Sequence, residues 1–80
     1  MFFGIIIYMS WNDRNCPHFH AVYQGEDAAF DFHGDALEGN LPTRQKKLIA
    51  AWAEIHSEEL AANWELAKQD AALFNIDPLR

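Results

Sequence analysis

Three histidines and one aspartate are the side chains of this sequence best suited to chemistry. His18 and His20 stand in a Pro-His-Phe-His string, and Asp31 and His33 follow shortly after. Imidazole titrates near neutral pH and binds divalent metals when neutral, and a neighbouring carboxylate fixes its tautomer. These residues are therefore candidates for a metal site or for acid–base catalysis, provided that the fold brings them together.

A β-hairpin is the element that would do so. Polar and apolar residues alternate in residues 18–24 and 27–33, and Gly25 lies between the two runs. This pattern predicts two antiparallel strands around a turn centred on Gly25 and Glu26. The expected cross-strand pairs are Tyr23 with Ala28, Ala21 with Phe30, His20 with Asp31 and His18 with His33.

Side chains alternate between the two faces of a strand, so this register sorts the hairpin into an apolar face and a polar face. The expected apolar face consists of Phe19, Ala21, Tyr23, Ala28, Phe30 and Phe32. The expected polar face consists of His18, His20, Asp31 and His33. Directly opposite Cβ atoms lie about 4.5–5.5 Å apart, so the polar residues would form one patch.

Three interpretations of this patch stay open. His20 and Asp31 could form an ordinary cross-strand pair on a half-exposed face. His18, His20, Asp31 and His33 could instead bind zinc or another divalent metal, with Cys16 adding a thiolate, although their spacing matches no standard zinc module. In the third interpretation His20, oriented by Asp31 and partnered by His18, performs acid–base catalysis such as metal-free RNA cleavage.

The remaining sequence supplies one more strand and a helical half. Residues 2–9 are rich in β-branched and aromatic residues, which predicts a strand. Turn-forming residues follow at 10–17, and glycines and a proline mark a loop over residues 34–42. The fold class predicted is α+β: a three-stranded antiparallel sheet over about residues 2–33, made of a strand and then a hairpin, followed by two C-terminal α-helices over about residues 43–72.

A break between the two helices is expected at His56 and Ser57. Leu48, Trp52 and Ile55 share one helical stripe. The second stripe, further round the helix, consists of Leu60, Trp64, Ala67 and Ala71. Ser57 is a good N-cap, and His56 would cap a helix or stabilise its C-terminus as a cation. One bent helix is the alternative. Pro78 ends the helical pattern, and the tail is expected to be frayed or tucked along the sheet.

The composition indicates one small cytoplasmic domain spanning residues 1–80. The net charge of −6 argues against direct nucleic-acid binding, which depends on neutralising phosphates. Cys16 is the only cysteine, so no intrachain disulfide is expected, and the apolar run at the N-terminus is too short to span a membrane. The many aromatic residues suggest that part of the apolar surface contacts a partner protein or a second copy of the chain.

The whole chain resembles a bacterial family catalogued as domain of unknown function 4160. The likeness rests on FFGIIIYM, the Asn12-Asp13 turn, PHFH at residues 17–20, Asp31, LPTR at residues 41–44, the helical run WAEIHSEELAANWELA at residues 52–67, and Pro78-Leu79. Two positions depart from the family pattern. Cys16 stands where a second proline is common, and His33 stands where an acidic residue is usual, which leaves His18, His20 and Asp31 as the better site.

The resemblance implies a function only loosely, because the activity of the family is unassigned. Members look like one half of two-gene modules, beside a small protein catalogued as domain of unknown function 2442. This layout suggests a partner-binding component of a toxin–antitoxin-like module. The alternative is a small nuclease-like toxin or metal-binding protein that uses the cluster of His18, His20 and Asp31, and whether the chain is an enzyme stays open.

Overall fold

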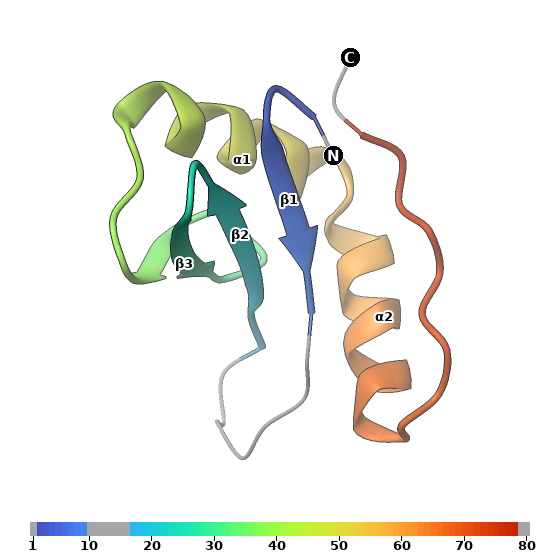
Figure 1. The fold of residues 1–80 in the computed structure, drawn as a ribbon. Coiled ribbons are helices and arrows are strands. Elements are labelled where there is room, and N and C mark those ends of the chain that lie inside the picture. The colour runs from blue at the N-terminus through green and yellow to red at the C-terminus, as the bar shows by residue number, and fades with distance from the viewer. Residues whose placement is uncertain (1, 10–16, 79–80) are drawn as a thin grey trace.

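The computed structural model describes residues 2–9 and 17–78. Within these residues the chain forms an antiparallel sheet followed by two helices, as Figure 1 shows. The strands are β1 (Ile5–Tyr8), β2 (Phe19–Tyr23), β3 (Glu26–Phe30) and β4 (Ala36–Glu38), and the helices are α1 (Thr43–Ile55) and α2 (Ser57–Lys68). The predicted α+β class with two C-terminal helices is confirmed, and residues 10–16, which include the expected turn and Cys16, lie outside the described part.

The sheet has four strands in the order β1-β2-β3-β4, so the expectation of three strands was wrong. The additional strand β4 lies in the segment predicted to be a loop, and all three of its residues are exposed. It pairs with β3 across a register shift between Ala29 and Phe30. A three-residue edge strand between glycines carries no alternation long enough for a sequence pattern to reveal it.

The hairpin turn is shorter than predicted. Tyr23 pairs with Glu26, so Gln24 and Gly25 alone form the turn, and both have positive φ angles of 49° and 82°. Such a two-residue turn matches the right-handed twist of the flanking strands, and glycine adopts its second position without strain. The register is therefore displaced by two residues from the prediction, and His20 lies opposite Ala29 instead of Asp31.

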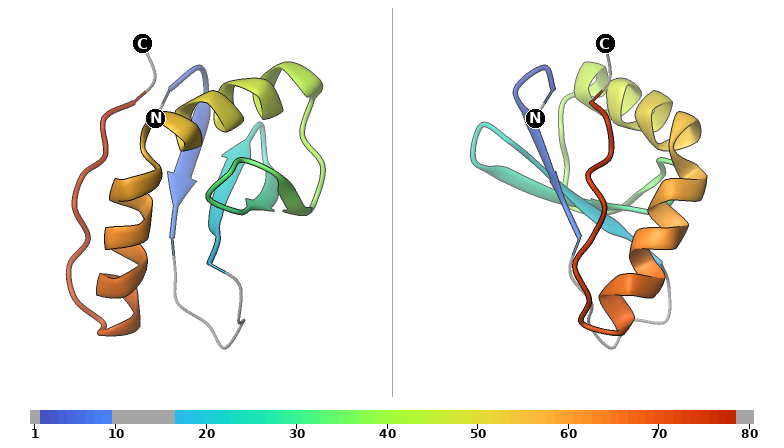
Figure 2. Two further views of the ribbon diagram at one scale, coloured as in Figure 1. Left: turned by 180° about the vertical axis from the view of Figure 1, so that it is seen from behind. Right: turned by 90° about the vertical axis from the view of Figure 1, so that its right-hand side faces the viewer.

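A displacement of two residues keeps the side chains within β2 and β3 on their predicted faces. Phe19, Ala21, Ala28 and Phe30 are all buried on the face that meets the helices, and the rings of Phe19 and Phe30 stack with centroids 5.8 Å apart. Both helices lie on this side of the sheet, and no described element covers its other side (Figure 2). The molecule is thus a two-layer sandwich with one open sheet face.

The break between α1 and α2 falls at His56, as expected from the change of apolar stripe. His56 itself stands at the junction, where its Nδ1 lies 2.6 Å from Oε1 of Glu59. Ser57 is the first residue of α2 and not its N-cap. Ile55, which shares the predicted helical stripe of Leu48 and Trp52, is 65% exposed. The bend turns α2 so that both helices cover the same sheet.

The helical half ends at Lys68, four residues before the predicted end. Asp70 has a φ of 54°, a left-handed conformation that a helix cannot contain, and the chain then runs back beside α2 as an extended segment (Figure 1). Residues 71–78 are called the C-terminal segment below. The segment runs alongside α2 (Figure 2), where the expectation was a frayed tail or one tucked along the sheet.

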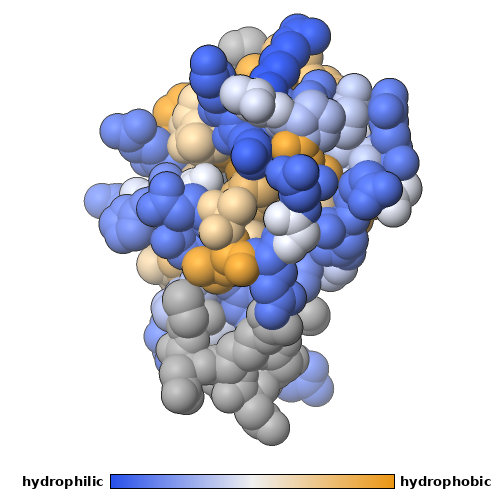
Figure 3. Space-filling model, turned by 90° about the vertical axis from the view of Figure 1, so that its left-hand side faces the viewer, coloured by the Kyte–Doolittle hydropathy of each residue, from blue (hydrophilic) through white to orange (hydrophobic). Residues whose placement is uncertain are grey.

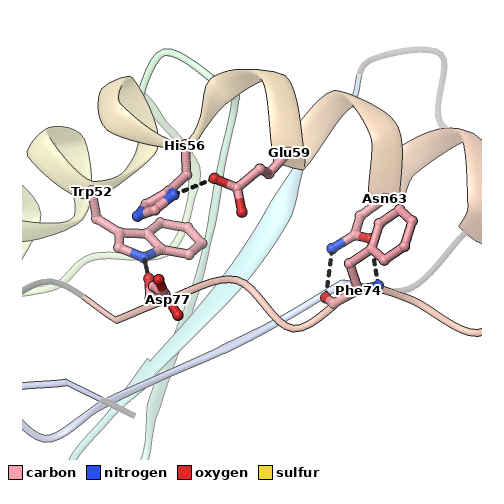
Figure 4. A network of polar contacts seen from close by, with 6 residues as sticks. All are labelled: Trp52, His56, Glu59, Asn63, Phe74 and Asp77. Carbon is pink, nitrogen blue, oxygen red and sulfur yellow. Dashed lines mark hydrogen bonds and ion pairs between the residues drawn. The ribbon is translucent and has the colours of Figure 1, made fainter.

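Side chains of the helices hold the C-terminal segment in place (Figure 4). The carboxamide of Asn63 donates to the Phe74 carbonyl over 3.0 Å and accepts from the Phe74 N–H over 2.8 Å. The indole N–H of Trp52 donates to the Asp77 carbonyl over 2.8 Å. Asn63 therefore satisfies the backbone of the segment as a neighbouring strand would.

Candidate functional site

Three polar side chains from three adjacent strands meet on the open sheet face. Tyr8 comes from β1, His20 from β2 and Asp27 from β3. Tyr8 lies opposite His20 in the β1–β2 ladder, whereas His20 and Asp27 are diagonal neighbours across β2 and β3. The alternation of the strands places all three on the side that the helices leave uncovered.

The carboxylate of Asp27 joins the other two side chains. The Tyr8 hydroxyl donates to its Oδ2 over 2.5 Å, and Nδ1 of His20 lies 3.2 Å from its Oδ1. The rings of Tyr8 and His20 stack with centroids 4.8 Å apart and planes inclined by 7°. We call this arrangement the Tyr8–Asp27–His20 network.

Hydrogen bonding shifts the pKa values inside this network. The hydrogen bond from Tyr8 is the largest cause that lowers the pKa of Asp27. The hydrogen bond and the charge of His20 lower this pKa further, whereas partial burial raises it. The same bond raises the pKa of Tyr8, with smaller contributions from burial and from the Asp27 charge. An ionised carboxylate only accepts, so Nδ1 of His20 carries the proton in this pair.

These shifts limit what the network can do chemically. A tyrosine with a raised pKa stays protonated near neutral pH and is neither a base nor a nucleophile. Asp27 divides its two oxygens between Tyr8 and His20 and so fixes both rings. The outcome is a flat, oriented aromatic surface on the open sheet face, which suits recognition of a partner.

His18 lies at the end of this surface and is buried. Its ring meets those of His20 and Trp64 edge to face, with centroids 5.2 Å away in each case. The structure therefore brings His18 and His20 together, as the sequence predicted. His18 stands just before β2 and packs against Trp64 of α2 at the margin of the sheet, so it is not part of the open sheet face.

Asp31 and His33 do not complete the predicted patch. Oδ1 of Asp31 accepts from the backbone N–H groups of His33 and Asp35, at 2.9 and 3.0 Å. Asp31 thereby stabilises the turn that leads from β3 to β4, and the exposed His33 belongs to the same turn. The predicted pairs of His20 with Asp31 and of His18 with His33 were wrong, because the two-residue turn moves Asp31 and His33 out of the predicted register.

The proposed metal ligands are not gathered at one point. Among residues 2–9 and 17–78, no group of three or more His, Cys, Asp and Glu side chains is arranged to hold a metal ion. His20 and Asp27 supply two donors, and Cys16 lies outside the described residues. The assignment of His18, His20 and Asp31 to catalysis stays a prediction, with Asp27 in the position that Asp31 was expected to take beside His20.

Tyr8 and Asp27 are the residues of the network that the sequence argument missed. Tyr8 was visible as an aromatic residue of the first strand, but nothing local linked it to the histidines. Asp27 is the second residue after the turn, and a two-residue turn at Gln24 and Gly25 brings it diagonal to His20. Asp27 could have been predicted as the partner of His20 only by choosing a two-residue turn.

Comparison with known proteins gives a family and no activity. A sequence model of the family described as Domain of unknown function (DUF4160) matches residues 4–65. The chain belongs to this family. No curated protein and no solved structure matches it. Within the described ranges, neither helix of this family member has the length and apolar character needed to cross a membrane.

Proposed function

We propose that this member of the family is a partner-binding protein, one component of a toxin–antitoxin-like two-gene module. The proposal rests mainly on the open sheet face, where β1 is an edge strand with exposed apolar side chains. Ile6 is 51% exposed and Tyr8 is 41% exposed, and Phe3, just before the strand, is 51% exposed. Neighbouring apolar side chains left in water are typical of a protein–protein contact surface.

The surface has features that favour tight association. Tyr8 is already held by Asp27 and by stacking on His20, so binding would cost it little conformational entropy. Tyrosine is a frequent anchor in the buried centre of interfaces. The edge of β1 that faces away from β2 also offers backbone groups to which a partner strand can add.

Charge indicates which partner would fit. The protein has a net charge of −6, and on β3 Asp27 lies on the open sheet face beside the exposed apolar side chains. A partner with an apolar centre and a basic rim would be steered to this face and held there in one orientation. The side of the molecule seen in Figure 3 is mostly hydrophilic, with small groups of hydrophobic residues between the hydrophilic ones.

The partner that we propose is the product of the adjacent gene, the small protein resembling domain of unknown function 2442. The test is a calorimetric titration of the two purified proteins, with size-exclusion chromatography to give the stoichiometry. We expect a complex at micromolar concentration. Two independent peaks and no heat of binding would overturn the proposal, and self-association of this chain alone would replace it with a homo-oligomer.

A pair of matched variants locates the contact. Ile6→Glu introduces a charge on the open sheet face, and Ile55→Glu makes the same change at an exposed isoleucine on α1. We expect Ile6→Glu to weaken binding by about tenfold or more, because an unpaired charge would be buried at the interface. Ile55→Glu should bind like the wild type. Equal loss in both variants would remove the open sheet face as the contact.

A further inference from the structure

A pocket lies between β1 and the C-terminal segment, on the side of the molecule away from β4. Its volume is 400 Å³, within the range of pockets that bind small molecules. Phe19, Trp52 and Leu60 form its floor, and all three are buried core residues. Ile7 and Met9 line one side. The pocket thus reaches the hydrophobic core from the edge of the sheet.

The C-terminal segment forms the opposite wall, chiefly through Leu73 and Ile76. This wall is fixed to the helices by the hydrogen bonds of Asn63 and Trp52 (Figure 4). Among the described residues no backbone hydrogen bond joins the segment to β1. In the described part of the chain, the hydrogen bonds of this wall therefore run to the helices, and Ile76 packs against the hydrophobic core.

The lining residues that the structure describes are all uncharged, although the protein carries a net charge of −6. Asn63 is one of the polar side chains of the lining, and both ends of its carboxamide are engaged by Phe74. A charged ligand would lose its hydration here without gaining an ion pair. The chemistry of the walls selects a neutral molecule that is apolar over most of its surface.

We propose that this pocket binds a small, neutral, mainly apolar molecule beneath the C-terminal segment. The ligand contacts the ring of Trp52 and the side chain of Leu60, and Leu73 and Ile76 cover it from the other side. Shape and apolarity determine what is accepted, because the Asn63 amide is already used. Tyr8 borders both this pocket and the open sheet face, but the proposed ligand contacts lie among core residues on the helix side of the sheet, so the proposal does not depend on the proposed partner.

The test uses N-phenyl-1-naphthylamine, a neutral apolar dye that fluoresces strongly when it leaves water. Titration of the intact protein should give a saturable increase in fluorescence. Leu73→Glu adds a charge to the pocket wall, and Leu37→Glu makes the same change at a leucine of similar exposure in β4, 43% against 39%. We expect Leu73→Glu to weaken dye binding by about tenfold or more and Leu37→Glu to leave it unchanged. Absence of saturable binding to the wild type would overturn the proposal.

Methyl NMR of the wild type locates the dye without any variant, in case Leu73→Glu detaches the segment. The methyl groups of Leu60 and Ile7 should shift on titration, and those of Leu37 and Ile55 should not. Shifts centred on Ile6 would mean that the dye adheres to the open sheet face, and they would overturn the proposal. Ile6→Glu should bind the dye like the wild type, which separates this site from partner binding.

Discussion

Asp27 connects three strands through a single carboxylate. One oxygen accepts from Tyr8 of β1 and the other pairs with His20 of β2, while the residue itself belongs to β3. A carboxylate in this position orders two aromatic rings on a surface that has no covering layer. The contribution to stability is modest, because cross-strand pairs of this kind are worth roughly 0.2–1 kcal/mol each and Asp27 is largely exposed to solvent.

Replacing Asp27 by asparagine should alter the pH dependence of stability. The folded state lowers the pKa of Asp27 below its ordinary value of 3.8, so its stabilisation is fully present above that pH and is lost as the pH falls through the folded pKa. We expect Asp27→Asn to be less stable than the wild type at pH 7 by roughly 0.5–1 kcal/mol, with the difference shrinking toward pH 3.

Urea denaturation at a series of pH values measures this difference. Tyr8→Phe serves as the companion variant, because it removes the main cause of the lowered pKa while keeping the carboxylate. Its stability should fall less steeply in acid than that of the wild type. A constant gap between wild type and Asp27→Asn from pH 7 to pH 3 would show that the carboxylate charge contributes nothing.

At the residue scale, the sequence predicted the faces of the hairpin but not the acid beside His20. Alternation separates apolar from polar side chains in any register displaced by an even number of residues. Which acid lies beside His20 depends on the length of the turn. Gln24 adopts a left-handed conformation there, which is uncommon for glutamine and so could not be predicted from the residue type. Asp31 was therefore chosen where the fold uses Asp27.

Gly34 determines how closely α1 approaches the sheet. It follows β3 in the turn to β4 and has a φ of 88°. A Cβ atom at this position would lie 2.5 Å from Cα of Ala50, which belongs to α1. The helix can therefore cross the end of the sheet only because this residue has no side chain.

We expect Gly34→Ala to destabilise the protein by roughly 2–4 kcal/mol, from left-handed strain together with displacement of α1. Gly25→Ala is the matched control, since Gly25 also has a positive φ but nothing within 4 Å of an added Cβ. It should cost only the strain, about 1 kcal/mol. Thermal and urea unfolding of both variants gives the comparison, and equal losses would contradict a role for the close approach.

At the scale of elements, long patterns were predictable and short ones were not. The change of apolar stripe at His56 located the junction of α1 and α2 correctly. In contrast, β4 is short, and all three of its residues are exposed. The end of α2 is set by the left-handed conformation of Asp70, and no glycine or proline stands there to mark a helix end in the sequence. Tertiary contacts decide both features, so local propensity could not supply them.

At the scale of the whole molecule, the C-terminal segment closes the open end of the sandwich between β1 and α2. It is largely exposed and would gain little from burial alone, so its hydrogen bonds to Asn63 and Trp52 hold it in place. The sequence limited its position to two alternatives, because Pro78 excludes a helix but does not choose a partner surface.

Asn63→Ala should release the C-terminal segment while leaving the sandwich folded. We expect a loss of roughly 1–2 kcal/mol in unfolding free energy and a large fall in hydrogen-exchange protection at the Phe74 amide, which donates to Asn63. Asn40→Ala, at an exposed asparagine before α1, is the control and should change neither quantity. Persistent protection of Phe74 in Asn63→Ala would mean that other contacts hold the segment.

The position of Trp52 has a consequence for the order of folding. Its ring meets Phe2 at 5.7 Å and Phe19 at 5.5 Å, and its N–H reaches Asp77, 25 residues further along the chain. Contacts between such distant segments must overcome loop-closure entropy, so they form after the local helices and the hairpin. The surroundings of this indole are therefore completed late in folding, after the helices and the hairpin have formed.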